Sequence, residues 1–465
     1  MSQRPYWLAQ ALAAEDGVTA PPLDGATRAG LCIVGGGFTG LWTAIRAKQQ
    51  RPELDVVVLE ADVCGAGASG RNGGCALTWS TKFFTLQRLF GDAEAQRLVR
   101  ASEQAVLDIE AFCVEHGIQC EWRRDGTLFT ATSAAQVGAS DAVVAALSAR
   151  GIHSWHRLPV EELQRRAGSV AHLEGWFSPL SATVQPGKLV RGLRRVALSL
   201  GVRLHEHTPM LALEEGSPPA VCTPRGTVTA DRVVIAINAW MASTFREFGR
   251  SIAIVSSDMV ITEPAAPALE ASGLDGGISV LDSRIFVHYY RSSADGRLML
   301  GKGGNTFAYG GRMASVFDQP SPYRDDLARR LHGFMPGLRD TPIAASWNGA
   351  SDRSVTGLPF FGQLRGRSDV FYGFGYSGNG VAPSRMGGEV LASLALGLDN
   401  EWTRSPLVRG PRGRFPPEPI RFLGSLIVRN AVRRKEAAED GGRRPLTLDV
   451  GLSRFAAAAG KADKA

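Results

Sequence analysis

Several features that define other classes of protein are missing from this chain of 465 residues. Its six cysteines form no C-x-x-C pair and show no zinc-ligand spacing, which argues against a disulfide framework or a zinc site. No stretch approaches the roughly 18 consecutive apolar residues of a transmembrane segment, and the N-terminus shows no signal-peptide pattern, so we expect a cytoplasmic protein. Without a P-loop, a G-x-S-x-G turn or a larger histidine cluster, neither NTPase, simple hydrolase nor metal-dependent chemistry is indicated.

Acidic residues are scarce in one part of the chain. The formal net charge is +7, and the segment 409–435 contributes strongly to it, with Glu418 as its only acid. Its basic residues are Arg409, Arg412, Arg414, Arg421, Arg429, Arg433, Arg434 and Lys435. Because the excess is local, nucleic-acid binding is not indicated. The segment is predicted to be either a solvated terminal helix or a dock for an anionic surface or a partner subunit.

Glycine, by contrast, is abundant, with 54 residues and no Gly-X-Y period. Many of these glycines are therefore expected where the backbone needs a positive φ or approaches a ligand closely. The first cluster lies in a β-α-β unit, predicted as a strand at 31–36, a helix at 38–52 and a buried strand at 55–60.

The turn between that strand and that helix reads G-x-G-x-x-G. Such a turn lets a pyrophosphate meet the helix N-terminus, and an acid about 20 residues further on can bind a ribose diol. A carboxylate at that place would repel a 2′-phosphate. The cofactor-binding residues predicted here are Gly35, Gly37, Phe38, Thr39, Gly40 and Glu60.

Two further glycine-rich segments favour FAD over NAD. After the second strand the chain gives a row of small residues at 65–74, where the backbone can run beside a long ligand. The turn 375–381 precedes a helix at 382–396, whose N-terminus could stabilise the negative charge of a reduced flavin pyrimidine. The cofactor-binding residues predicted from these segments are Ala68, Ser69, Arg71, Asn72, Gly73, Gly74, Gly378, Asn379, Gly380 and Val381.

Taken together, VGGGFTGL, GASGRNGG, VVIAINAW and GYSGNGV resemble the FAD-dependent D-amino-acid-oxidase-type superfamily over about residues 5–400, and within it the γ-glutamylputrescine oxidoreductase-like branch. The resemblance implies an α/β fold of the two-domain α+β kind, with a Rossmann-like FAD-binding domain and an antiparallel-sheet substrate domain. It places 25–85, 150–240 and 343–400 in the FAD-binding domain. Residues 86–149 and 241–342 would form the substrate domain, and 401–465 a basic C-terminal extension.

The resemblance also assigns individual residues. Met210 stands where a backbone group contacts adenine, and Trp347 with Asn348 would flank the flavin ring. Asn379 replaces a histidine of many relatives, so a positive imidazolium near the flavin is not expected. The stretch 345–354, where relatives with linked flavin carry cysteine, has none, which implies non-covalent FAD. Sarcosine-oxidase-like members carry a carboxylate-binding lysine just after the last glycine-rich turn. The corresponding residues 381–383 of this chain contain no lysine, which disfavours a small α-amino acid as the substrate.

The segment 283–291 is predicted as a strand along the substrate. Alternation puts Phe286, His288 and Tyr290 on one side. We expect His288 and Tyr290 to face the flavin as catalytic residues, although a core His/Tyr pair is the competing interpretation. Candidate substrate contacts are Arg284, Arg291 and Tyr376, with surface ion pairs as the alternative for the two arginines.

The predicted function is oxidation of a primary or secondary amine, such as an amino acid, a polyamine derivative or an N-alkyl amine. The imine would be hydrolysed to an aldehyde and ammonia or an amine, with oxygen reduced to hydrogen peroxide. The expected partners are thus a small-molecule amine and oxygen. Two alternatives stay open: a flavin amine dehydrogenase that reduces a quinone or a carrier, and a regulator that holds FAD without turnover.

Overall fold

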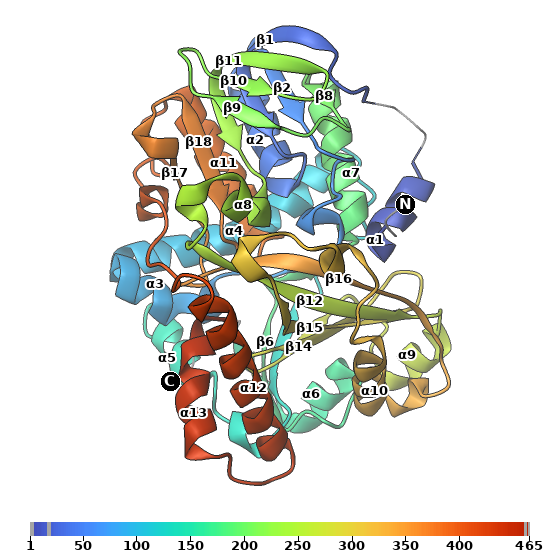
Figure 1. The fold of residues 1–465 in the computed structure, drawn as a ribbon. Helices are drawn as coiled ribbons and strands as arrows, with labels where there is room; N and C mark the ends of the chain where they lie inside the picture. The colour runs from blue at the N-terminus through green and yellow to red at the C-terminus, as the bar shows by residue number, and fades with distance from the viewer. Residues whose placement is uncertain (1–3, 16–19, 460–462, 464–465) are drawn as a thin grey trace.

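Two sheets, drawn one above the other in Figure 1, organise the computed structural model, which describes residues 4–15, 20–459 and 463. The first sheet consists of β17 (Phe360–Gln363), β18 (Val370–Phe374), β11 (Gly226–Ile235), β1 (Gly25–Val34), β2 (Val56–Leu59) and β8 (Arg203–His205), in that spatial order. The strands from β18 to β8 run parallel, and β9 (Ala212–Glu214) and β10 (Ala220–Cys222) extend β11.

Helices pack against this parallel sheet, so its central strands are continuously apolar, as in the fully buried Val56–Leu59. The helices α2 (Phe38–Gln50) and α11 (Pro383–Leu396) contact its strands. Further out, α4 (Asp92–Glu115) packs on α11, α7 (Pro186–Ser199) packs on α2, and α1 (Tyr6–Ala13) packs on α7. The helices α2 and α11 pack closely because Gly388 has no side chain: a Cβ there would lie 2.3 Å from the Cβ of Trp42.

The second sheet is antiparallel except for the parallel pair β13–β4. Its order is β16 (Ile343–Ser354), β12 (Ile252–Thr262), β15 (Leu298–Phe307), β14 (His288–Ser292), β13 (Ser279–Asp282), β4 (Thr127–Ala131), β6 (Glu174–Ser178) and β5 (His156–Arg157). A hydrophobic cluster joins it to α6 (Val160–Ala167), α9 (Ala266–Ser272) and α10 (Arg324–Phe334). The predicted fold class, an α/β sheet domain with a mainly antiparallel second domain, is confirmed.

The remaining strands and α-helices lie in the connections between these elements or in the C-terminal extension. They are β3 (Cys75–Ala76), α3 (Phe83–Phe90), α5 (Asp141–Ser148), β7 (Ala182–Thr183), α8 (Met241–Thr244), α12 (Ile420–Asp440) and α13 (Thr447–Ser453). None of the helices formed by the described residues combines the length and the apolar character needed to cross a membrane.

The strand pairing departs from the predicted domain boundaries at three places. β5, β6 and β16 lie in ranges predicted for the FAD-binding domain, but all three pair within the second sheet. Conversely α4, expected in the substrate domain, packs on the first sheet's helices, with the rings of Trp42 and Phe112 4.8 Å apart. Sheet membership depends on pairing between distant segments, which local sequence patterns do not encode.

The basic C-terminal extension is not a solvated tail. α12 and α13 form a hairpin against the second sheet, seen in red at the lower left of Figure 1. Its arginines bind acceptors on that sheet: Arg429 donates to the carbonyl of Asn305 at 2.9 Å, and Arg433 donates to its side-chain oxygen at 2.9 Å. The segment forms the predicted terminal helix, but one face of that helix is packed on the second sheet and only the other is solvated.

Candidate active site

A cavity of about 560 Å³ lies between the two sheets. On the first sheet it is lined where β1, β2 and β11 end, by Val34, Leu59 and Ala236 among others. On the second sheet it is lined by side chains of β12, β14 and β16. Ligands of doubly wound proteins bind at the carboxyl ends of parallel strands, so the cavity occupies the expected position for a nucleotide cofactor.

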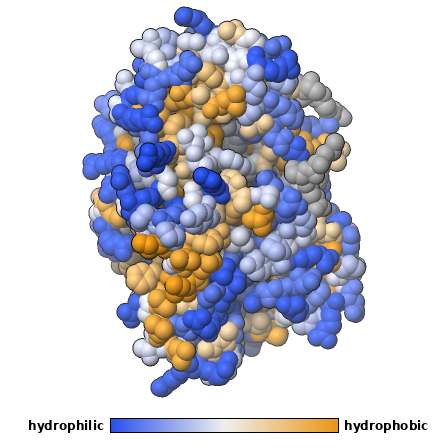
Figure 2. Space-filling view, in the orientation of Figure 1, coloured by the Kyte–Doolittle hydropathy of each residue, from blue (hydrophilic) through white to orange (hydrophobic). Residues whose placement is uncertain are grey.

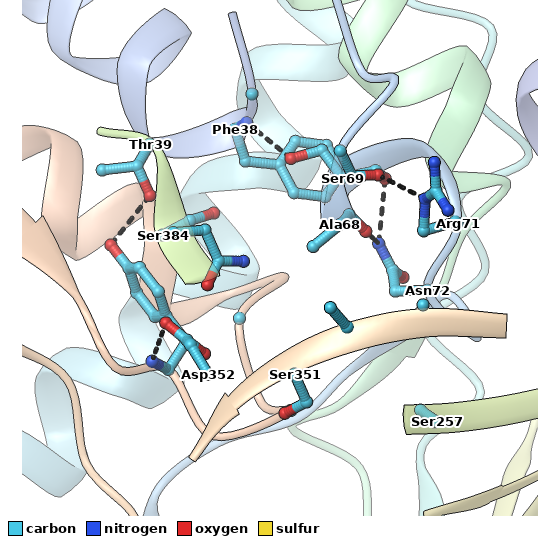
Figure 3. A pocket seen from close by; sticks show the side chains of 18 of the residues that line it. Phe38, Thr39, Ala68, Ser69, Arg71, Asn72, Ser257, Ser351, Asp352 and Ser384 are labelled. Carbon is cyan, nitrogen blue, oxygen red and sulfur yellow. Dashed lines mark hydrogen bonds between the residues drawn. The ribbon is translucent and has the colours of Figure 1, made fainter. Parts of the chain in front are cut away.

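The glycine-rich turn brings the N-terminus of α2 to this cavity. Phe38 begins the helix, and its N–H donates to the Ser69 hydroxyl at 2.8 Å (Figure 3). A Cβ on Gly37 would lie 2.9 Å from the same hydroxyl, so only glycine leaves this approach open. Gly40 does not line the cavity: its Cβ would lie 1.9 Å from the carbonyl oxygen of Gly35, and it serves the packing of the helix on the strand.

Glu60 follows β2 and lines the same cavity. Its carboxylate accepts the backbone N–H of Gly36 at 2.7 Å and that of Asp62 at 3.0 Å. Burial raises the pKa of the Glu60 carboxyl, and these two hydrogen bonds oppose the rise. Next to it Asp62 pairs with Arg4, two lining residues that the sequence motifs did not indicate.

The loop 65–74 is folded by its own polar side chains. The Asn72 amide donates to the carbonyls of Ala68 and Ser69 and accepts the N–H of Gly74 at 2.8 Å. Arg71 donates to the carbonyls of Ala66 and Gly67 and forms an ion pair with Asp318 at 3.0 Å. Arg71 thus ties the loop to the segment between β15 and α10, and the ion pair partly neutralises its charge.

The turn 375–381 is held by a carboxylate beneath it. Asp352, on β16, accepts the backbone N–H groups of Gly375, Tyr376 and Ser377, the last two at 3.2 Å each. Burial raises the pKa of this carboxyl to about 6. Above the turn, the Thr39 hydroxyl donates to the Tyr376 hydroxyl at 2.9 Å, which joins the first and last glycine-rich turns (Figure 3).

The structure brings most of the predicted cofactor-binding residues to the cavity. Those that line it are Gly35, Gly37, Phe38, Thr39, Glu60, Ala68, Ser69, Arg71, Asn72, Gly73, Met210, Gly378, Gly380 and Val381. Gly74 lies just outside, and Asn379 points instead toward Thr78, whose carbonyl accepts from its amide at 3.3 Å. The predicted substrate contact Tyr376 also lines the cavity.

The predicted face of the substrate strand is wrong. His288 and Tyr290 point away from the cavity into the cluster under α6 and α10. His288 Nδ1 lies 2.8 Å from Asp282, and burial together with Lys302 lowers the pKa of this imidazole to about 3. The Tyr290 hydroxyl donates to the carbonyl of Ala167 at 2.7 Å. These side chains are the core pair of the competing interpretation, and Tyr289 lines the cavity instead.

Four other predicted site residues are buried structural groups outside the cavity lining. The Trp347 indole donates to the carbonyl of Arg71 at 2.8 Å, and the Asn348 amide donates to that of Val316 at 2.7 Å. Arg284 forms ion pairs with Asp282 and Asp440.

Arg291 lies beneath the glycine-rich loop. It donates to the carbonyls of Gly73 and Val184 at 2.7 and 2.8 Å and stacks on Trp7. Neither of the two arginines is an anion anchor in the cavity, and neither is a surface ion pair.

The part of the cavity that the second sheet lines was largely missed by sequence reasoning. Its polar groups include Tyr289, whose hydroxyl lies 3.0 Å from that of Ser257, and Arg353, whose guanidinium donates to the carbonyl of Ser377. Burial lowers the pKa of Arg353 to about 10. The apolar lining here is Leu77, Met259, Leu281, Ile285, Phe286 and Val287. Alternation separates Tyr289 from Tyr290 without showing which of them meets the cavity, and nothing local marks Arg353.

The C-terminal hairpin forms the outer side of this wall. Glu436 of α12 accepts the backbone N–H of Ile285 at 3.1 Å and of Phe286 at 3.4 Å. Lys302 donates to the carbonyl of Phe286 at 2.9 Å, and Val432 packs with the ring of Phe286. The segment that closes the cavity is therefore positioned by residues of the extension.

The chemistry of the cavity fits FAD. One end offers Glu60 beside the parallel strands, the middle offers the N-terminus of α2 beside Ser69, and the other end offers Arg353 and the turn that Asp352 orders. In that order, such groups would suit the ribose, the pyrophosphate and the electron-rich ring of FAD. Gly73 leaves room beside Tyr289, since a Cβ on Gly73 would lie 2.4 Å from the Tyr289 ring.

Comparison with known proteins agrees with this chemistry. A family model described as FAD dependent oxidoreductase matches residues 31–394. Probable oxidoreductase OrdL of Rhizobium meliloti (strain 1021) is 32% identical over 391 residues, covering 82% of this chain and 86% of that protein. Gamma-glutamylputrescine oxidoreductase of Escherichia coli (strain K12) is 27% identical over 401 residues, covering 85% and 91%.

Solved structures agree on the fold. The crystal structure of glycine oxidase from Geobacillus kaustophilus superimposes with a TM-score of 0.68 at 22% identity, and the match covers 83% of this chain and 99% of that one. At this identity the likeness concerns the arrangement of the two sheets.

Proposed function

Because the chain belongs to the DAO family of FAD-dependent oxidoreductases, which act on amines or amino acids, we propose that it oxidises a primary or secondary amine to an imine. Water then hydrolyses the imine to an aldehyde and ammonia or a smaller amine. With oxygen as acceptor, one amine, one oxygen and one water give one aldehyde, one ammonia or amine and one hydrogen peroxide. FAD, held without a covalent bond, supplies the acceptor for the hydride.

The residues proposed to hold the cofactor follow its length. Glu60 would accept the ribose hydroxyls, and the backbone of Met210 would contact the adenine. The pyrophosphate would meet the N-terminus of α2 beside Ser69. Gly378 and Gly380, in the turn held by Asp352, would present backbone N–H groups to the flavin pyrimidine.

The observation that carries the proposed reaction is the lining of the cavity's substrate end. Its walls combine apolar side chains with the hydroxyls of Tyr289 and Ser257. Such walls exclude water and favour an uncharged amine, the form whose neighbouring C–H bond is oxidised. Arg353 offers a cation for an acidic group of the substrate or for charge on the flavin pyrimidine. The nearby carboxylate of Asp352 is already satisfied by three N–H groups and is not proposed as a base.

The proposal is tested by a panel of polyamines, γ-glutamylated amines, N-methyl amino acids and small amino acids. We expect at least one of the first three groups to yield equimolar aldehyde and hydrogen peroxide in air. Turnover restricted to small α-amino acids would contradict the substrate class. Turnover with an artificial electron acceptor but no peroxide in air would replace the oxidase by the dehydrogenase alternative.

A further inference from the structure

The outer surface of the C-terminal hairpin carries large apolar side chains that the fold leaves uncovered. On α12, Ile420, Leu423 and Ile427 recur at helical spacing and are 62, 54 and 55% exposed. In the second half of the hairpin, Leu446, Leu448 and Phe455 are 68, 69 and 80% exposed. We call these six residues the hairpin patch; Figure 2 shows apolar side chains gathered over this part of the molecule, at the lower left. Large exposed apolar side chains gathered on one hairpin in this way mark an interaction surface.

The orientation of α12 is unusual for a surface helix. Helices on soluble proteins normally turn their large apolar side chains inward and their charges outward. Here charged side chains face the protein: Arg421 donates to the carbonyl of Ile252 at 3.2 Å, Arg433 to Asn305, and Glu436 accepts from Ile285. The stripe formed by Ile420, Leu423 and Ile427 faces away, and packing among residues 4–15, 20–459 and 463 does not account for it.

Charge around the hairpin patch identifies the kind of partner. The turn and helix at 441–459 contain Arg443, Arg444 and Arg454, all exposed, and a single acid, Asp449. Asp449 is 2% exposed and paired with Arg434 at 2.6 Å. The patch is therefore flanked by uncompensated positive charge, which matches an anionic lipid surface. A second copy of the chain placed symmetrically on the same patch would bring these arginines together, which is unfavourable.

We propose that the α12–α13 hairpin docks the enzyme on an anionic lipid bilayer, with the hairpin patch inserted among the lipids and Arg443, Arg444 and Arg454 on their headgroups. The inference is independent of the reaction assigned above. It adds a consequence for the cavity: Glu436, on the inner face of the same helix, holds the wall at Ile285, so the substrate end lies behind the docked hairpin.

The experiment measures sedimentation of the full-length, FAD-loaded protein with vesicles of phosphatidylcholine, with or without phosphatidylglycerol. We expect binding to the anionic vesicles, weakened by salt because headgroup attraction is screened. Leu423→Glu with Ile427→Glu should lower the vesicle affinity about tenfold or more, since two inserted apolar side chains become charged. Arg443→Glu with Arg444→Glu should remove most of the salt-dependent part of the vesicle affinity.

The control is Val114→Glu, matched to Leu423→Glu alone, which places one such charge at a valine that is 79% exposed on α4, outside the patch. This variant should bind vesicles as the unmodified protein does, and FAD content verifies that every variant is folded. Failure of the unmodified protein to bind anionic vesicles would overturn the proposal, as would an equal loss of binding in Val114→Glu. A dimer in lipid-free solution that Leu423→Glu converts to a monomer would also overturn it and assign the patch to a second copy.

Discussion

The contact between Glu436 and the cavity wall predicts a measurable loosening when that carboxylate is removed. Glu436 is 8% exposed and accepts two backbone N–H groups, from Ile285 at 3.1 Å and from Phe286 at 3.4 Å. A hydrogen bond to a charged group contributes about 1.5–3 kcal/mol, and only the shorter contact lies within the usual distance range. Glu436→Ala should therefore lower the local free energy of opening by about 2 kcal/mol, which raises the population of the locally open state roughly 30-fold.

The direct assay is amide hydrogen exchange in the peptide that contains Ile285 and Phe286, which reports opening of the wall without requiring a known substrate. Exchange there should accelerate by about 30-fold in Glu436→Ala and less in Glu436→Gln, which keeps one acceptor oxygen. The KM for the amine should rise while FAD content stays constant. Glu439→Ala is the matched control, because Glu439 pairs with Lys435 on the same helix. Unchanged exchange in Glu436→Ala, or the same acceleration in Glu439→Ala, would refute the reasoning.

Three further predictions concern the cofactor, the strand face and pH. Glu60→Gln should weaken FAD binding about tenfold or more relative to the exposed control Glu53→Gln, measured by fluorescence titration, because a charge-assisted bond to the ribose is lost. Tyr290→Phe should lower the free energy of unfolding by about 1–3 kcal/mol and leave turnover unchanged, because the hydrogen bond from Tyr290 to Ala167 is buried. Tyr289→Phe should change turnover instead. The reverse pattern would contradict the assigned faces of the strand. Burial lowers the pKa of His172 from 6.5 to about 4, so between these pH values the native state binds fewer protons than the unfolded state, and the stability supplied by neutral His172 is lost as the pH falls. The unfolding free energy should therefore fall between about pH 7.5 and pH 5, and His172→Gln should remove about 2 kcal/mol of that fall, measured by urea denaturation. An unchanged pH dependence in His172→Gln would exclude this origin.

The first β-α-β unit could be predicted from sequence because its determinants are local. The apolar strands, the glycine spacing and Glu60 all lie within about one supersecondary unit, and the structure brings them to one cavity. The loop 65–74 and the turn 375–381 reached the same cavity for a related reason. Each begins where a parallel strand ends, and such ends share one edge of the sheet.

The substrate face could not be predicted with equal success. Both faces of β14 are buried, so alternation separates Tyr289 from Tyr290 without indicating which of them meets the cavity. The strand also begins at His288, and the preceding residues Ile285 and Phe286 form a loop that contacts α12. Arg353 and Asp352 reach the site through β16, whose pairing with β12 is a long-range contact. The role of the extension depends in the same way on contacts between segments about 150 residues apart.

The central claim, that this cavity binds FAD for amine oxidation, is tested most directly by the absorption spectrum of the purified protein under anaerobic conditions. The account predicts an oxidised flavin spectrum, equimolar FAD that leaves the chain on acid denaturation, and bleaching of the flavin band when the substrate amine is added. A protein that is colourless and takes up no FAD, or a flavin band that no amine bleaches, would contradict it.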